Sequence, residues 1–156
     1  MLDVELTSGK GAKLGMTRRE AREQAFLLIF EQSFNGRPVA EIVEDARAAR
    51  DFCDDDFTGR LAEGVAEKSG ELDELIERHS IGWRKNRISR ISMALLRMAC
   101  YEMLYFDDVP VSVSINEAVE LSKKYAGEDD AAFINGILGG IDKELTVPEQ
   151  GGLEST

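Results

Sequence analysis

The chain contains few of the residues that build metal centres or disulfide scaffolds. Among its 156 residues there are two cysteines and one histidine. Cys53 and Cys100 lie far apart, without a CxxC pair or a neighbouring histidine, so a zinc site with about four clustered ligands is not expected. Both cysteines are expected to be small buried residues in a reducing cytoplasm rather than the halves of a disulfide.

Long hydrophobic segments are also missing. No apolar run approaches the roughly 20 residues that cross a bilayer. Residues 1–15 carry acids and glycines without an apolar stretch, which predicts a flexible extension rather than a signal peptide. We expect one helical domain over residues 16–146, a flexible tail over 147–156, a cytoplasmic location and no contact with a membrane.

The motifs of common catalytic and nucleotide-binding sites are absent as well. Neither usual glycine-rich phosphate loop is found. His79 has no serine or cysteine at a recognisable motif spacing, and a single histidine near a helix end is usually structural or solvated. Charge-rich helix surfaces account for the many carboxylates. We therefore expect a protein that is not an enzyme and that holds no cofactor or metal.

Positive charge is scarce, but it is grouped. The chain has 19 lysines and arginines against 30 acidic residues, a formal net charge of −11, which excludes a broad basic surface for coating nucleic acid. Residues 17–26 nevertheless hold three arginines, and residues 78–101 hold six basic residues without a carboxylate. Local patches on a repelling background favour a selective contact with an anionic partner.

Hydrophobic periodicity predicts an all-α fold of about seven helices. No segment alternates apolar and polar residues between turn signals, so no sheet is expected. Thr17 with Glu20, and Ser114 with Glu117, form predicted capping boxes at two helix starts. The expected helices are Thr17 to about Phe34 with a stop at Asn35-Gly36, Pro38 to about Phe52, residues 54–56 through Ile76, Arg87 to Phe106, Ser114 through Ala126, and a last helix that includes Ile134 to Leu145. The apolar stripe of the third expected helix begins at Phe57. The apolar face of the helix from Ser114 is expected to hold Ile115, Ala118, Val119, Ser122, Tyr125 and Ala126.

Three glycines interrupt the helical pattern of the last segment. Gly136, Gly139 and Gly140 each cost roughly 1 kcal/mol relative to alanine inside a helix. A second helix packed very close, or a partner that approaches the backbone, would compensate.

The arginines of the first helix allow two interpretations. Arg18, Arg19 and Arg22 fall within an arc of about 100°, with Phe26 and Phe30 below them on the same side. Arginines that fork onto phosphates beside a ring that stacks on a base are typical of single-stranded RNA binding. Helix periodicity alone favours the alternative, in which the arginines are solvated and both rings belong to the core.

The second basic group behaves similarly. Arg87, Arg90 and Arg97 fall within about 80° on one face of the expected long helix. A solvated face explains them, although such a face in an acidic protein would normally carry glutamates too. The pattern therefore indicates a ligand at this face.

Three segments, in order along the chain, resemble signatures of the transcription antitermination factor NusB family. They are "RREAREQAFLLIF" (18–30), "LRMACYE" (96–102) and "VPVSVSINEAVELSKKYAGEDDAAFINGIL" (109–138). The resemblance extends from about Met16 to Leu145, and residues 35–80 match only in helical pattern. It implies an all-helical fold of two three-helix groups with a seventh helix.

The resemblance also implies a function and its partners. Family members bind boxA, a short single-stranded RNA element of ribosomal RNA transcripts, and pair with NusE, a small-subunit ribosomal protein. The pair joins RNA polymerase and other Nus factors and suppresses premature termination. The RNA-binding residues that the resemblance implies are Arg18, Arg19, Arg22, Phe30, Arg97, Tyr125 and Asp129.

The chain departs from the family pattern at two of these places. Glu20 stands where relatives often have another arginine, and Phe30 replaces a common tyrosine. Residues 17–24 hold three arginines and two glutamates, a net charge of only +1. This departure predicts a strong reliance on the protein partner for RNA affinity.

Two other functions stay open at the level of sequence. Helical domains of this kind also precede the catalytic domain of some rRNA cytosine methyltransferases, which would make this chain a fragment. Some family members are reported to form homodimers, and a homodimer that covers the basic patch would make the chain an interaction module.

Overall fold

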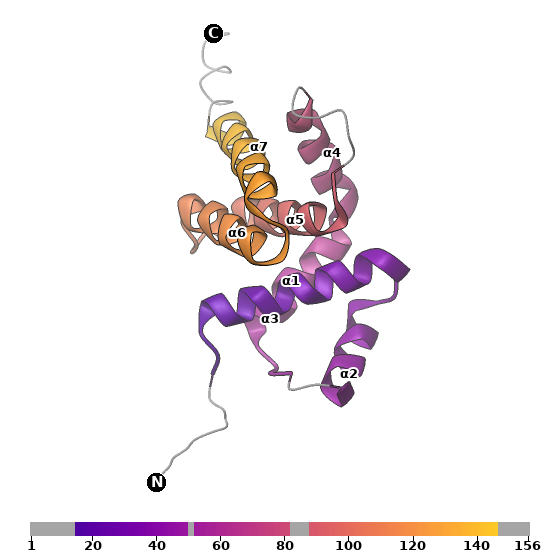
Figure 1. The fold of residues 1–156 in the computed structure, drawn as a ribbon. Helices are drawn as coiled ribbons and strands as arrows, with labels where there is room; N and C mark the ends of the chain where they lie inside the picture. The colour runs from indigo at the N-terminus through magenta and orange to yellow at the C-terminus, as the bar shows by residue number, and fades with distance from the viewer. Residues whose placement is uncertain (1–14, 50–51, 82–87, 147–156) are drawn as a thin grey trace, which may run out of the picture. The chain divides into compact units, whose positions relative to one another are not determined.

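The computed structural model describes residues 15–49, 52–81 and 88–146, and every regular element in these ranges is an α-helix (Figure 1). The predicted all-α fold is therefore confirmed. The helices are α1 (Arg18–Asn35), α2 (Val39–Ala49), α3 (Asp56–Glu67), α4 (Ser69–Ser80), α5 (Arg90–Tyr105), α6 (Val111–Tyr125) and α7 (Glu128–Thr146). The predicted extension, apart from Gly15, and the predicted tail lie outside the described residues.

The chain divides into two units between Glu67 and Lys68. The N-terminal unit holds α1 to α3 and the C-terminal unit holds α4 to α7, so the expected seventh helix belongs to the second group. The single helix predicted from residues 54–56 through Ile76 is wrong, because Lys68 leaves the helical region with φ −104° and ψ 16°. The Ser69-Gly70 pair that follows is a turn signal that could have revealed this break.

The core of the N-terminal unit lies where α1 packs against α2 and α3. The first helix ends as predicted at Asn35, with Gly36 in the left-handed region at φ 68°. The second helix is shorter than predicted, because Pro38 precedes it and its last residue is Ala49. The buried apolar side chains of this unit are Ala21, Ala25, Phe26, Leu28, Ile29, Val39, Ile42, Ala46, Phe57, Leu61, Ala62 and Val65.

In the C-terminal unit, α5 packs against each of the other three helices. More apolar side chains are buried on α5 than on any other helix of this unit. Its N-cap is Ser89, whose hydroxyl accepts from the Ser92 amide at 3.1 Å. The expected start of this helix at Arg87 lies outside the described residues.

The start of α6 differs from the prediction. Pro110 caps the helix, which begins at Val111, so the capping box predicted at Ser114 is wrong. Ser114 is buried one turn inside the helix, and its hydroxyl donates to Glu102 at 2.8 Å. The buried face consists of Ser114, Glu117, Ala118, Leu121 and Ser122. Ala118 and Ser122 are therefore buried as predicted, whereas Ile115 and Val119 are only half-buried.

One of the glycines in α7 is explained by a close contact inside the C-terminal unit. A Cβ at Gly140 would lie 3.1 Å from Nδ1 of His79, whereas one at Gly139 would meet nothing within 4 Å. His79 Nε2 contacts Glu144 Oε1 at 2.5 Å, and Arg78 Nη2 donates to Glu144 Oε2 at 2.7 Å. These bonds, from Arg78 first and His79 second, hold the pKa of Glu144 below its ordinary value. His79 therefore joins α4 to α7, in agreement with the expected structural role.

Candidate functional site

The start of α1 is fixed by the predicted capping box. The Thr17 hydroxyl accepts from the Glu20 amide at 3.0 Å, and the Glu20 carboxylate accepts from the Thr17 amide at 2.9 Å. These two bonds satisfy backbone donors that a helix start leaves unpaired. The Glu20 carboxylate is therefore engaged in the cap, and Arg18 and Arg19 occupy the first two positions of the helix.

The three arginines of α1 do not share one environment. Arg18 and Arg19 are exposed, whereas Arg22 is only 2% exposed and is among the largest fully buried side chains. Arg22 precedes the buried Phe26 by one helical turn, so it lies on the face that packs inward. That i, i+4 relation was visible in the sequence. The predicted surface arc of three arginines is therefore wrong for Arg22, and only Arg18 and Arg19 are exposed.

The ring of Phe57 on α3 holds two of these arginines. The Arg18 guanidinium carbon lies 4.2 Å from the ring centroid, and that of Arg22 lies 5.1 Å from it. Phe57 is itself buried, so the contacts are cation–π interactions made partly out of water. The sequence pattern identified Phe57 as a core residue and missed its role in orienting Arg18.

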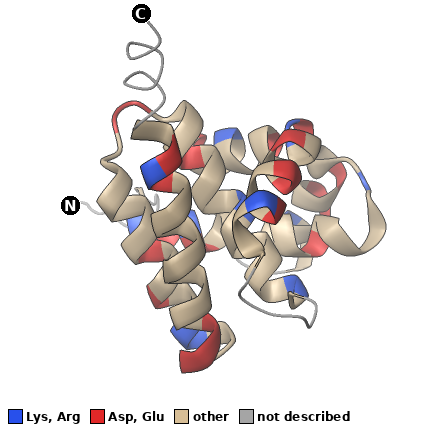
Figure 2. Cartoon of the chain, turned by 90° about the horizontal axis from the view of Figure 1, so that it is seen from above, with Lys and Arg blue, Asp and Glu red and all other residues tan. Residues whose placement is uncertain are grey.

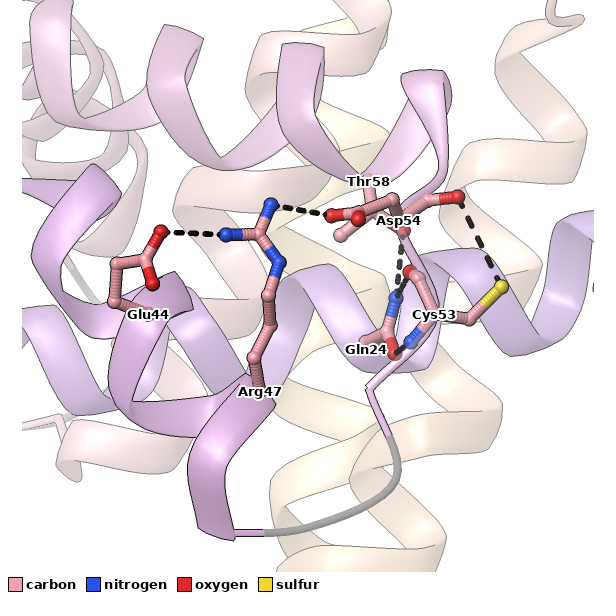
Figure 3. Close-up of polar contacts among 6 residues, drawn as sticks. All are labelled: Gln24, Glu44, Arg47, Cys53, Asp54 and Thr58. Atoms are coloured by element: carbon pink, nitrogen blue, oxygen red, sulfur yellow. Dashed lines mark hydrogen bonds and ion pairs between the residues drawn. The ribbon is translucent and has the colours of Figure 1, made fainter.

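Polar contacts hold the segment that precedes α3 (Figure 3). Phe57 lies in the first turn of that helix. The Gln24 side chain donates to the Cys53 carbonyl at 2.9 Å and accepts from the Cys53 amide at 3.1 Å. Thr58 donates to the Ala21 carbonyl at 2.9 Å. Arg47 bridges Glu44 and Asp54 at 2.6 and 2.7 Å. The segment before α3 is thus pinned to α1.

The two cysteines differ in burial. Cys100 is fully buried in α5, as expected, and burial raises the pKa of its thiol to about 12. Cys53 is only half-buried, because it lies in the segment between α2 and α3 rather than inside a helix. Both thiols are free.

Aromatic side chains continue along α1 below the arginines. Phe26 is buried, Phe30 is half-buried and Phe34 is 57% exposed. The Phe30 ring lies 6.0 Å from the Phe26 ring and 4.9 Å from the Phe34 ring, measured between centroids. The core interpretation therefore holds for Phe26. Phe30 is partly accessible, and its stacking on an RNA base stays a prediction.

Arg97 in the C-terminal unit already has a partner. Its guanidinium donates to Asp73 from Nε at 2.7 Å and from Nη2 at 3.1 Å, which is a bidentate pair between α5 and α4. An RNA phosphate at Arg97 would use the remaining Nη1 edge or displace Asp73. Arg90 is exposed at the start of α5, and Arg87 lies outside the described residues.

Tyr125 and Asp129 flank the turn between α6 and α7, where Gly127 has φ 128°. Tyr125 is half-buried, with the Lys124 ammonium 5.4 Å from its ring centroid, and Asp129 is exposed. The adjacent Asp130, which sequence reasoning missed, accepts from the Ser92 hydroxyl at 2.9 Å. The candidate residues thus divide between the two units, with Arg97, Tyr125 and Asp129 in the C-terminal unit and the others in the N-terminal unit, and their RNA-binding roles stay predictions.

Charges of both signs are interspersed over the helices (Figure 2). In the described ranges, no three His, Cys, Asp or Glu side chains are grouped so that they could hold a metal ion. No helix there is both long and apolar enough to cross a membrane.

The described part of the chain is thus an all-α protein of two helical units, with an exposed arginine pair at the capped start of its first helix. The model of the NusB family matches residues 19–143, and the chain belongs to this family.

Its relatives include the transcription antitermination protein NusB of Ruminiclostridium cellulolyticum, with 40% identity over 82% of this chain and 90% of the relative. The Bacillus subtilis protein of the same name is 38% identical over 83% of this chain and 98% of the relative.

Solved structures agree with the sequence relatives. The structure of T. maritima NusB matches with a TM-score of 0.73 and 32% identity, over 84% of this chain and 94% of that one. A crystal structure of antitermination factors NusB and NusE in complex with dsRNA matches with a TM-score of 0.72 and 25% identity, over 81% of this chain and 96% of that one. The predicted fold and family are therefore confirmed.

Proposed function

We propose that this chain is an antitermination factor that binds boxA RNA of ribosomal RNA transcripts together with NusE. The observation that carries the proposal is that the chain belongs to the NusB family. A similar solved structure contains a NusB protein in complex with NusE and RNA. In the cytoplasm, the pair would join RNA polymerase and other Nus factors. The chain would contribute recognition of the RNA and no chemical step.

The start of α1 supports this role on physical grounds. Arg18 and Arg19 are exposed in the first turn of a helix, where the helix dipole also favours an anion. Guanidinium groups match phosphate oxygens in two-pronged hydrogen bonds. The chain's net charge of −11 opposes contact with arbitrary RNA, so binding would depend on a few well-placed groups.

The exposed charge also supports a need for the partner. Residues 17–24 carry a net charge of +1, and one of their three arginines is buried. Two exposed arginines neutralise few phosphates. Basic contacts from NusE would add to them, and we expect the pair to bind RNA more tightly than the chain alone.

Equilibrium binding of fluorescent RNA tests the proposal. The chain is titrated with and without NusE into boxA RNA and into an RNA of the same composition in scrambled order. We expect a preference for boxA that is stronger with NusE. If three to five phosphates are neutralised, the slope of log K against log salt should be roughly −2 to −3.5, from about −0.7 for each phosphate on a single strand.

Equal affinity for boxA and scrambled RNA in the presence of NusE would contradict the proposal. Light scattering of the same samples separates the interaction-module alternative. A homodimer that persists without dissociating when RNA and NusE are added would favour that alternative.

A further inference from the structure

A polar hollow of about 340 Å³ lies in the N-terminal unit, between the starts of α1 and α3. Its lining includes two arginines, two aspartates and an aromatic ring: Arg18, Arg60, Asp55, Asp56 and Phe57. Ligand pockets in proteins span about 300–1,000 Å³, so this one is at the small end of that range. It has room for about one nucleotide.

Arg18 enters the hollow with its hydrogen-bonding edges available. The Arg18 guanidinium carbon lies over the Phe57 ring, 4.2 Å from the ring centroid. Among the residues that the structure describes, Arg18 makes no hydrogen bond or ion pair through its side chain. An arginine guanidinium carries five N–H donors in one plane. The contact with Phe57 therefore orients Arg18 without using its donors.

The two aspartates have different tasks. Asp55 is engaged in the structure, because its Oδ1 accepts from the Phe57 and Thr58 amides at 2.8 and 3.3 Å and so caps α3. Asp56 is exposed in the first turn, and within the described ranges its carboxylate has no hydrogen-bond or ion-pair partner. Arg60 lies one turn further along the same face of α3 and is exposed too.

The balance of charge indicates what this hollow binds. Two arginines and two aspartates cancel, so a phosphate alone gains little there. A neutral group with donors and acceptors side by side fits better, and the Watson–Crick edge of an unpaired RNA base is such a group. Guanine carries two neighbouring donors, N1–H and the N2 amino group, next to the O6 acceptor. A carboxylate can accept from both donors while an arginine donates to O6.

We propose that this hollow holds one unpaired guanine of the bound RNA. Asp56 accepts from N1–H and the N2 amino group, Arg60 donates to O6, and Arg18 contacts the adjoining phosphate. The inference rests on the proposed RNA-binding function, which it extends by naming a base and the residues that select it.

Short RNAs that differ in one base test the inference. The native chain with NusE is titrated into three oligouridines of equal length whose central base is guanine, inosine or adenine. Inosine keeps N1–H and O6 and lacks only the N2 amino group. Because that group makes a charge-assisted bond to a carboxylate, we expect roughly tenfold weaker binding of the inosine RNA.

Two variants locate the preference. Asp56→Asn should bring the guanine and inosine RNAs to within about twofold of each other, with circular dichroism confirming the helices. Glu67→Gln removes the same charge from an exposed position at the end of α3, outside the hollow, and should keep the native ratio.

The possible failures are distinguishable. Equal binding of the guanine and inosine RNAs by the native chain overturns the subsite and leaves the proposed function standing. An unchanged ratio in Asp56→Asn also overturns the subsite. A chain that binds none of these RNAs, nor boxA, with or without NusE overturns the proposed function and the subsite together.

Discussion

Replacement of Arg22 by alanine should destabilise the fold, although an arginine at a helix surface would tolerate it. The side chain is 2% exposed, and its guanidinium carbon lies 5.1 Å from the centroid of the buried Phe57 ring. Truncation of large buried side chains costs about 2–5 kcal/mol, and a desolvated cation–π contact is worth up to about 2 kcal/mol. Because these terms overlap, we expect a loss of about 3 kcal/mol in unfolding free energy.

Urea unfolding followed by circular dichroism measures this loss. Arg19→Ala is the matched control, because it removes the same charge from an exposed position of the same helix, and it should change the free energy by no more than about 0.5 kcal/mol. Arg22→Met keeps the volume of the aliphatic stem and should recover part of the loss. If the unfolding free energies of Arg22→Ala and Arg19→Ala differ by less than about 0.5 kcal/mol, the assignment of Arg22 to the core is refuted.

Three further predictions concern stability and reactivity. Gly139→Ala should stabilise α7 by about 0.5–1 kcal/mol in urea unfolding, whereas Gly140→Ala should gain less or lose, because its Cβ would lie 3.1 Å from the His79 ring; equal gains would contradict the contact. Because the pKa of Glu144 is lowered in the folded chain, its ionised carboxylate stabilises the fold at pH values above the ordinary carboxyl pKa of 4.5. This stabilisation is lost as the pH falls through the lower pKa of the folded state. Glu144→Gln should therefore lose less stability than the parent between pH 6 and pH 3, and an unchanged loss would refute the role of this carboxylate. In the native chain, iodoacetamide should label Cys53 well before Cys100, whose thiol is buried with a pKa of about 12; mass spectrometry that finds equal rates would contradict that burial.

Local signals predicted much of the helical fold. The capping box of Thr17 and Glu20 and the stop at Asn35-Gly36 need only residues within a few positions of each other, and both are confirmed. The capping box at Ser114 failed because the same residue pattern also suits a buried position. Its hydroxyl bonds to Glu102, twelve residues away, and Pro110 starts the helix earlier.

The candidate site was predictable in its composition and less so in its geometry. The cluster at Arg18 and Arg19 follows from the sequence alone. The burial of Arg22 depends on the packing of α3 against α1, which a single helix pattern does not contain. The pairing of Arg97 with Asp73 likewise joins residues 24 positions apart, on different helices.

The affinity of a double variant for boxA RNA in the presence of NusE tests the central claim most directly. Arg18→Ala combined with Arg19→Ala removes both exposed arginines at the start of α1. Arg37→Ala combined with Arg78→Ala removes the same charge at residues outside the candidate RNA-binding set, where the arginines make exposed ion pairs that contribute little stability. With charge-assisted contacts worth about 1.5–3 kcal/mol each, the first variant should bind boxA at least tenfold more weakly while the second stays within about threefold of the parent. Equal losses in the two variants would show that net charge, and not the start of α1, carries the binding, and would contradict the account.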